Sequence, residues 1–178
     1  MDATQRIVTA LARLRAAAAE RAGFGRGTAT SVSTLNAGLR CSTTERTLSI
    51  ATDLAPALGG EGAAPSPSAL ARAALGACLA MGYRLRAAEL GIELTSVRVT
   101  VEADSDVRGM LDPAAGVPPG FTAVRYHVEI ASPAPAADVA RLVELGDQLS
   151  PVLDLVARPH AVTRTVAIAG AEPTGAVA

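Results

Sequence analysis

Apolar and polar residues alternate along the chain with two different periods, and each period predicts its own kind of element. Near the N-terminus, apolar residues recur every three to four positions in an alanine-rich stretch, which predicts a helix over about 4–21. The glycines of GFGRG end this helix. Strand-like segments separated by short polar turns then predict an antiparallel meander, with strands over about 28–35, 38–42 and 47–52.

The segment PSALARAALGACLAMGYRLRAAEL predicts a long second helix over 67–90. Ser66 is a suitable N-cap, Pro67 suits the first helical position, and Gly91 ends the helix. The first half is apolar nearly all round, and a helix of that kind is buried on most of its sides. The short strands of one chain are too few to cover it, so we expect an obligate dimer.

The segments TSVRVTVEAD and TAVRYHVEI alternate strictly between apolar and polar residues. This pattern predicts two antiparallel strands with one solvent-exposed face, over about 95–104 and 122–130. The glycine- and proline-rich segment between them, 109–120, is expected to be a flexible loop. Three further elements complete an α+β fold: a helix over about 136–149, a short helix after Pro151 and a strand over about 161–169.

The chain of 178 residues is 49% hydrophobic and 19% charged, which is typical of a globular domain. We predict a single domain over 1–178, with a core at about 28–170 and a frayed tail at 171–178. The net charge of −1, without charge blocks, argues against nucleic acid or a membrane as a partner. The charged N-terminal segment does not resemble a signal peptide, and no apolar run is long enough to span a bilayer, so we expect a soluble cytoplasmic protein.

The set of reactive residues in the chain lacks what most enzyme chemistries require. All 16 basic residues are arginine, so the chain has neither a P-loop lysine nor a lysine for a Schiff base. The triplet His127-Val128-Glu129 matches half of a zinc-deaminase motif, but the P-C-x-x-C half is absent. The two histidines and two cysteines have no recognised metal-ligand spacing, so no metal and no cofactor are expected.

Cys78, in the middle of the long predicted helix, is the remaining candidate for chemistry. A buried cysteine is often an inert small apolar residue, whereas a thiolate in suitable surroundings is a nucleophile. The small residues Ala74 and Gly82 share its helical face and leave space around the sulfur. That space suits either a close-packed second helix or a narrow apolar pocket, and the sequence leaves both open.

Three segments resemble the OsmC/Ohr-like superfamily of osmotically inducible protein C and organic hydroperoxide resistance proteins: LGGEGAAPSP, PSPSALARAALGACLAMGYRLRAAELGIEL and LVELGDQLSPVLDLV. The likeness covers about 28–170. It implies antiparallel sheets wrapped around long central helices in an intertwined homodimer, with sites at the dimer interface. It also implies that the central-helix cysteine attacks a hydroperoxide, that a second cysteine before a proline resolves the product, and that an arginine and a glutamate assist.

By this resemblance, Cys78 corresponds to the attacking cysteine, and Arg40 lies near the place of the assisting arginine. Ser150 of the SPV segment stands where the family has its resolving cysteine, and a hydroxyl cannot form a disulfide. Ser68 stands where the family has its glutamate, and serine would hold an arginine only weakly. Only half of the peroxidase constellation is therefore present.

Attack on an O–O bond requires a thiolate, which apolar surroundings disfavour unless a cation lies beside it. Arg72 and Arg84 project about 120 degrees around the helix from Cys78, so they are expected to reach solvent or the partner subunit. Arg40, from this chain or from the other subunit, is therefore the cation we expect near the thiol. A sulfenic acid on Cys78 would need an outside thiol or Cys41 for its reduction.

Three functions are compatible with these residues. The leading one is one-cysteine, thiol-dependent reduction of organic hydroperoxides in oxidative stress defence, with an external thiol as reductant. The second is a non-catalytic dimer that binds a small apolar ligand. The third is a structural or interaction role in which Cys78 only fills space. Whether the protein is an enzyme stays open at this point.

Overall fold

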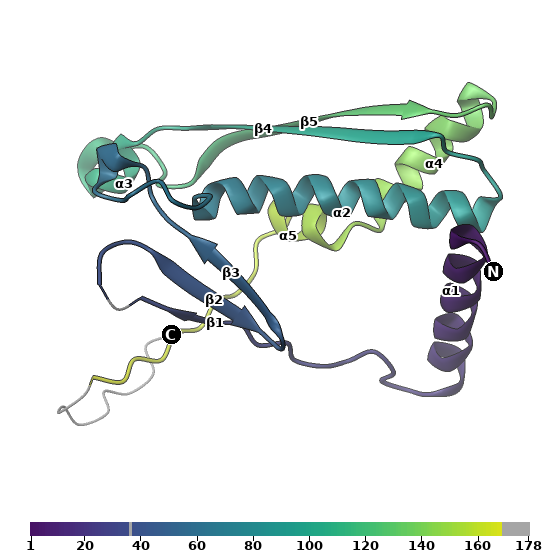
Figure 1. The fold of residues 1–178 in the computed structure, drawn as a ribbon, viewed down its shortest axis with the longest axis horizontal. Helices are drawn as coiled ribbons and strands as arrows, with labels where there is room; N and C mark the ends of the chain where they lie inside the picture. The colour runs from purple at the N-terminus through teal and green to yellow at the C-terminus, as the bar shows by residue number, and fades with distance from the viewer. Residues whose placement is uncertain (36, 169–178) are drawn as a thin grey trace.

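The computed structural model describes residues 1–35 and 37–168 and has an α+β fold with antiparallel sheets, as the sequence predicts. The long helix α2 lies between the β4–β5 pair on one side and the β1–β3 sheet on the other (Figure 1). Within the described residues the elements are, in order, α1 (Ala3–Glu20), β1 (Val32–Thr34), β2 (Cys41–Glu45), β3 (Leu48–Thr52), η1 (Pro56–Leu58), α2 (Pro67–Leu90), β4 (Ser96–Ser105), α3 (Arg108–Leu111), η2 (Pro113–Ala115), β5 (Phe121–Ala131), α4 (Ala136–Gln148) and α5 (Pro151–Ala157).

The helix α2 begins and ends where the sequence predicts. The Ser66 hydroxyl accepts a hydrogen bond from the Ala69 N–H at 3.2 Å, and Pro67 occupies the first turn, where a missing N–H costs nothing. Gly91 ends the helix in the left-handed region with a φ of 67°. Four of the five buried residues of α2, from Leu75 to Ala87 at intervals of four, lie along one side, so burial on most sides, as expected from composition, is not reached within one chain.

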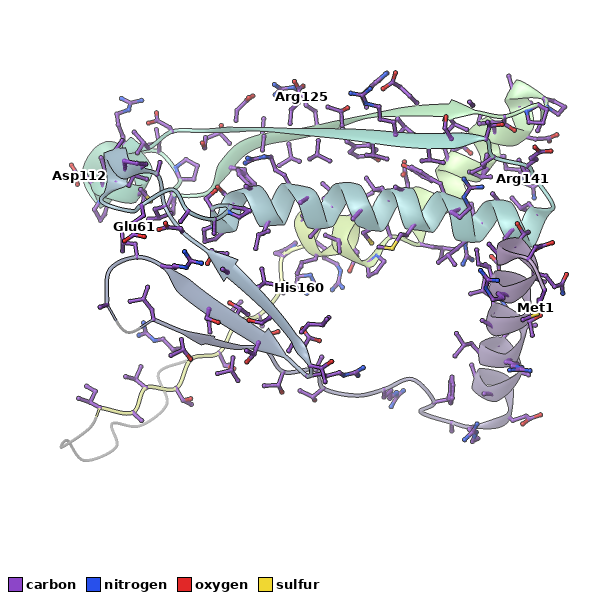
Figure 2. The ribbon with its side chains drawn as sticks, in the orientation of Figure 1. Met1, Glu61, Asp112, Arg125, Arg141 and His160 are labelled. Carbon is purple, nitrogen blue, oxygen red and sulfur yellow. The ribbon has the colours of Figure 1, made fainter. Side chains whose placement is uncertain are left out.

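The strands β4 and β5 pair antiparallel and pack one face against α2, which confirms the predicted alternation. Valines such as Val99 and Val128 pair on the face toward the helix. Arg125 points away from the helix (Figure 2), and its Nε lies 2.8 Å from Glu102 Oε2 on the solvent face. The core between the sheet, α2 and α4 contains six buried side chains: Leu75, Leu79, Tyr83, Ala87, Leu94 and Leu142.

The strands β1, β2 and β3 form the predicted antiparallel meander, and this sheet lies apart from α2 (Figure 1). Its apolar side chains stay uncovered within the chain, because Val32 is 56% exposed, Leu48 69% and Ile50 50%. The strand β2 begins at Cys41 rather than at 38, since Gly38 has the positive φ of a turn, 65°. The element order was therefore predictable here, but the strand bounds were not.

A buried carboxylate organises the loop between β3 and α2. Asp53 accepts hydrogen bonds from three backbone N–H groups, those of Leu54, Glu61 and Ala63, at 2.8, 3.2 and 3.0 Å. These bonds, that of Ala63 first, and the nearby Arg40 lower the pKa of Asp53 below its ordinary value, although burial opposes them. The ionised carboxylate thus holds the loop that leads into α2.

The helix α1 matches the helix predicted over 4–21 to within one residue at each end. The Asp2 carboxylate caps it by accepting the Gln5 N–H at 2.7 Å. The helix contacts α2, and Arg15 forms an ion pair with Glu89 near the end of α2. In the part of the chain that the structure describes, no helix combines the length and apolarity needed to cross a bilayer.

The segment 109–120, which its glycines and prolines predict to be a flexible loop, includes short helical turns. It contains most of the short helix α3 and the 3-10 turn η2. The Asp112 carboxylate accepts the Ala114 N–H at 2.8 Å, and Pro113 has the φ of a helical turn. A side-chain hydrogen bond therefore stabilises a turn that composition alone reads as irregular.

The strand expected over 161–169 is wrong for its described part. Residues 161–168 contain a single bridged residue, Arg164, and no strand. Val162 is 89% exposed and Ile168 60%, so the alternating apolar residues find no partner strand within the described chain. Residue 169 and the predicted tail, 171–178, lie outside the described residues.

Candidate functional site

The thiol of Cys78 lies against the hydroxyl of Ser150. Cys78 is half-buried in the middle of α2, and its Sγ is 3.4 Å from Ser150 Oγ. Ser150 is buried, and its Oγ accepts the Leu153 N–H at 3.3 Å as the N-cap of α5. Because this oxygen accepts from the backbone, its own hydrogen is available to the sulfur. The fold thus brings Cys78 and Ser150, which are 72 positions apart in the sequence, into contact.

An open pocket of about 240 Å³ adjoins the Cys78 thiol. Its walls are mostly apolar, and they come from α2, the end of α4 and the start of α5: Met81, Gly82, Leu85, Arg86, Gly146, Leu149, Ser150 and Pro151. Within the chain, the space around the sulfur is therefore a pocket. Of the two possibilities that the sequence left open, the structure shows the pocket.

Two glycines, Gly82 of α2 and Gly146 of α4, lie beside this pocket where the two helices approach each other. A Cβ at Gly146 would lie 2.8 Å from Tyr83 Cε1 and closer still to Cδ1, so the Tyr83 ring occupies the place of a side chain there. A Cβ at Gly82 would lie 3.8 Å from the Gly146 carbonyl oxygen, an ordinary contact distance. Gly146 is therefore required by close packing, whereas Gly82 leaves room in the pocket.

A carboxylate ties the end of α4 to α2 and β5. Asp147 accepts hydrogen bonds from the Tyr83 hydroxyl at 2.6 Å and the Tyr126 hydroxyl at 2.9 Å. Burial, together with the hydrogen bond to this carboxylate, raises the pKa of Tyr126 to about 12 and that of Tyr83 further. Both phenols therefore remain donors at physiological pH. The Ser150 N–H donates to the Asp147 carbonyl at 3.2 Å, so this anchor also fixes the backbone that places Ser150.

Arg40 lies elsewhere in the chain. It is exposed just before β2, near the Asp53 carboxylate, and it lines a shallow surface hollow together with Cys41. Cys41 is a free thiol whose residue pairs with Thr52 of β3. Within one chain, neither Arg40 nor Cys41 is among the residues that line the Cys78 pocket.

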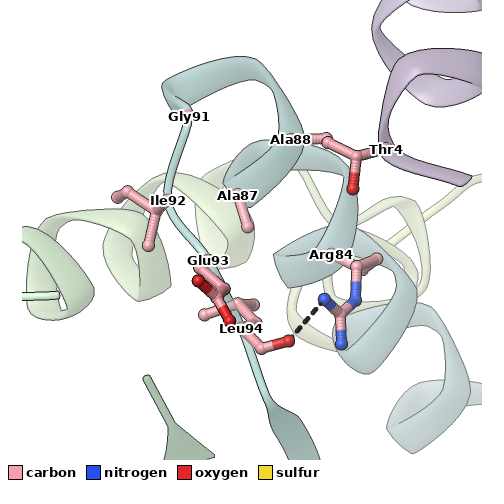
Figure 3. A pocket seen from close by; sticks show the side chains of 8 residues that line it. All are labelled: Thr4, Arg84, Ala87, Ala88, Gly91, Ile92, Glu93 and Leu94. Atoms are coloured by element: carbon pink, nitrogen blue, oxygen red, sulfur yellow. Dashed lines mark hydrogen bonds between the residues drawn. The ribbon is translucent and has the colours of Figure 1, made fainter. Parts of the chain in front are cut away.

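The other residues weighed from the sequence also lie outside this pocket. Ser68 is exposed in the first turn of α2, and its hydroxyl is 3.0 Å from that of Ser66. The Arg72 guanidinium lies over the Phe121 ring, 5.9 Å from its centroid. Arg84 donates to the Leu94 carbonyl at 2.8 Å, beside a separate hollow between α1 and the end of α2 (Figure 3).

Arg86 is the residue that the sequence interpretation missed. It lines the Cys78 pocket, and its side chain is only 12% exposed. Its Nη1 is 2.6 Å from Glu89 Oε2, and Glu89 Oε1 in turn pairs with the Arg15 guanidinium. Arg86 follows Cys78 by eight positions, and positions four and eight apart share a helical face. This helical spacing from Cys78 was the signal in the sequence that could have pointed to Arg86.

The residues of a possible metal site are not assembled. Among residues 1–35 and 37–168, no three histidine, cysteine or acidic side chains come together in a group that could hold a metal ion. His127 lies in β5 and pairs with Thr100 of β4. The pocket beside Cys78 is thus lined by a thiol, a hydroxyl and an arginine, and its other walls are mostly apolar.

The family model of the OsmC-like proteins matches residues 60–165, a range that includes Cys78, Arg86 and Ser150. The chain belongs to the OsmC-like family. Solved structures share its fold, and an OsmC-like protein from Mycoplasma pneumoniae is 18% identical with a TM-score of 0.62, covering 74% of this chain and 89% of its own.

Two organic hydroperoxide resistance proteins are also similar in structure. The protein from Legionella pneumophila is 24% identical with a TM-score of 0.56, and the match covers 73% of this chain and 89% of that one. The protein from Elizabethkingia anophelis, with bound thiocyanate, is 17% identical with a TM-score of 0.55, covering 75% and 90%. The comparison with curated proteins gives no match. At these identities the structural likeness shows the OsmC-like fold.

Proposed function

We propose that this protein reduces organic hydroperoxides with Cys78 as its only reacting cysteine, in oxidative stress defence in the cytoplasm. The observation that carries the proposal is the Cys78 thiol, which opens into an apolar pocket with the Ser150 hydroxyl 3.4 Å from the sulfur. A hydroperoxide with a small apolar group can enter such a pocket with its O–O bond against the thiol. The family membership and the hydroperoxide resistance proteins of the same fold support this reaction.

In the proposed step, the Cys78 thiolate attacks the terminal oxygen of a hydroperoxide ROOH. An S–O bond forms, the O–O bond breaks, and the alkoxide leaves with the electron pair and takes up a proton to become ROH. The sulfur loses two electrons and ends as a sulfenic acid. Ser150 supplies a hydroxyl hydrogen beside the sulfur, which stabilises the thiolate before attack.

An external thiol then completes the cycle. Because Ser150 cannot form a disulfide, a small-molecule or protein thiol attacks the sulfenic sulfur, releases water and leaves a mixed disulfide. A second thiol reduces that disulfide and restores Cys78. We therefore expect slow turnover with a dithiol reductant, since no disulfide forms within the chain at this site.

The protein is proposed to act as a homodimer. The β1–β3 sheet leaves Leu48 and Ile50 exposed, and Met81 beside the pocket is 62% exposed. A second copy that covers α2 with this sheet would bury these side chains. The arginine expected beside Cys78 would then have to come from the second copy, because Arg40 does not line the Cys78 pocket within one chain. This arrangement remains a prediction, and the sedimentation coefficient at micromolar concentration tests it.

Mass spectrometry of the oxidised thiol tests the proposed reaction. The native protein is treated with one equivalent of cumene hydroperoxide in the presence of dimedone, which traps sulfenic acids. We expect the adduct on the Cys78 peptide, also in Cys41→Ser and not in Cys78→Ser. Absence of the adduct from Cys78, or equal labelling of Cys41, would contradict the proposal.

A second function is supported by the apolar walls of the pocket alone. Met81, Leu85 and Leu149 would bind a small apolar ligand whether or not Cys78 reacts. In that case Cys78 stays unmodified by the hydroperoxide, while a small apolar compound still protects it from alkylation.

A further inference from the structure

Cys78 and Arg86 both line the pocket beside the thiol, about two helical turns apart on α2. Cys78, Gly82 and Arg86 follow one another at intervals of four residues on one face of α2, and all three line the pocket. Eight residues of helix correspond to a rise of about 12 Å. Gly82, between Cys78 and Arg86, has no side chain. A bound molecule that spans the pocket can therefore contact both Cys78 and Arg86.

The single negative charge of Glu89 is shared by two arginines, Arg86 and Arg15. The cluster of two arginines and one glutamate therefore has one net positive charge. The ion pair with Glu89 involves Nη1, and a guanidinium has donors on its other two nitrogens. The Arg86 guanidinium is thus held in place while donors remain for a ligand.

The burial of Arg86 and Glu89 separates their ion pair from an ordinary surface pair, while Arg15 at the outer side of the cluster is 67% exposed. Exposed pairs contribute little and are common, but the side chains of Arg86 and Glu89 are each only 12% exposed. A charge kept at the wall of an apolar pocket loses hydration, and an anion that enters the pocket would replace it. The remaining walls, from Met81, Leu85 and Leu149, offer contact only to an apolar body.

We infer that Arg86 is a specificity-determining residue that selects molecules with a carboxylate attached to a small apolar body. The carboxylate binds Arg86, the apolar part lies along Leu85 and Leu149, and the far end reaches Cys78. The pocket of about 240 Å³ exceeds the cavity of about 150 Å³ that holds benzene in another protein, so a substituted aromatic ring fits. The inference rests on the proposed function only in that both use this pocket.

A matched pair of ligands tests the inference without any oxidation. The compounds 4-isopropylbenzoate and 4-isopropylbenzamide have nearly the same shape and differ in charge. Each is titrated against the full chain carrying Cys41→Ser, and its dissociation constant is read from the slowed iodoacetamide alkylation of Cys78. We expect the benzoate to bind about tenfold more tightly, because a charge-assisted hydrogen bond is stronger than a neutral one.

Arginine variants on the same helix locate the effect. Arg86→Gln should abolish the preference for the benzoate, and Arg86→Lys should keep part of it, since lysine keeps the charge but not the planar pair of donors. Arg84→Gln removes the same charge two positions away, where the guanidinium donates to Leu94 outside the pocket. This control should keep the full preference. Melting temperatures verify that all variants are folded.

Two results would overturn the inference: equal affinity for the benzoate and the benzamide, or the same loss of preference in Arg84→Gln as in Arg86→Gln. A parallel reaction separates it from the proposed function. Cumene hydroperoxide and its 4-carboxylate are compared for dimedone labelling of Cys78. No labelling by either, with the benzoate preference intact and dependent on Arg86, refutes the peroxidase reaction and supports the carboxylate site.

Discussion

The half of the molecule built from α2, β4, β5 and α4 buries Leu79 and Leu142 completely, whereas the β1–β3 sheet leaves Leu48 69% exposed. The packed half holds the Cys78 thiol, the Ser150 hydroxyl and Arg86 in fixed places. The open half carries Arg40 on an uncovered surface. One chain therefore builds the thiol pocket by itself, whereas the apolar side chains of its β1–β3 sheet stay uncovered within that chain.

Ser150→Cys gives the largest expected effect, because it tests how firmly the packed half holds its site. With a Sγ to Oγ distance of 3.4 Å, the new thiol should form a disulfide with Cys78 after one equivalent of hydroperoxide, read as a loss of two hydrogens. A bond closing a loop of 72 residues would raise the free energy of unfolding by up to about 4 kcal/mol. Ser68→Cys, on the same helix as Cys78, is the control and should form no disulfide with Cys78. A Ser150→Cys protein that stays reduced would show that the site is not held as described.

Leu79→Ala should destabilise the packed half by about 3 kcal/mol, because it leaves a cavity at a fully buried position. Leu111→Ala makes the same change at a side chain that is 68% exposed, and its effect should stay within about 0.5 kcal/mol. Denaturation in urea measures both. Similar losses in the two variants would erase the distinction between core and surface on which the comparison depends.

Gly146→Ala should cost about 2 kcal/mol, because the added Cβ overlaps the Tyr83 ring that Asp147 holds. Gly82→Ala makes the same change where the nearest atom is 3.8 Å away, so stability should be kept. The new methyl group enters the pocket, however, and should slow the alkylation of Cys78. The two variants thus separate packing from access to the thiol. An unchanged melting temperature in Gly146→Ala would contradict the close packing.

Asp53→Asn tests the open half and has the smallest expected effect. The pKa of Asp53 lies below its ordinary value of 3.8 in the folded chain. Its contribution to stability is therefore present above the ordinary pKa and is lost as pH falls through the lower folded value. The native protein should be more stable than Asp53→Asn at pH 7, and the difference should shrink below about pH 4. If the stability difference between the native protein and Asp53→Asn grew as the pH fell, the predicted direction of the pH dependence would be wrong.

The elements with local signals were predictable from the sequence. Ser66 and Gly91 define both ends of α2, and the alternation of β4 and β5 identifies their buried face. The segment 161–168 has a similar alternation but no partner strand within the described chain, and partners are a property of the whole fold. Local patterns therefore predicted the strands that pair with the neighbouring strand in sequence, and failed at 161–168, where the described chain provides no partner strand.

The candidate site was predictable only in part. Cys78 could be chosen by elimination, and the resemblance paired it with Ser150, which the fold places in contact with it. Arg86 was missed because its role depends on where α4 and α5 close the pocket, and helical spacing from Cys78 is too common a signal to select one arginine. Arg40 lies outside the pocket within one chain, so its expected role still depends on a second copy.

The two tyrosines that donate to the Asp147 carboxylate can serve as an intrinsic optical probe of this region. The chain has two tyrosines and no tryptophan, and both tyrosines donate to this one carboxylate. Near-ultraviolet absorption and intrinsic emission therefore originate almost wholly from Tyr83 of α2 and Tyr126 of β5, whose hydroxyls meet at Asp147, three residues before Ser150. Any event at the Cys78 pocket that shifts α4 would change this signal, so ligand entry or thiol oxidation can be followed in real time without a label.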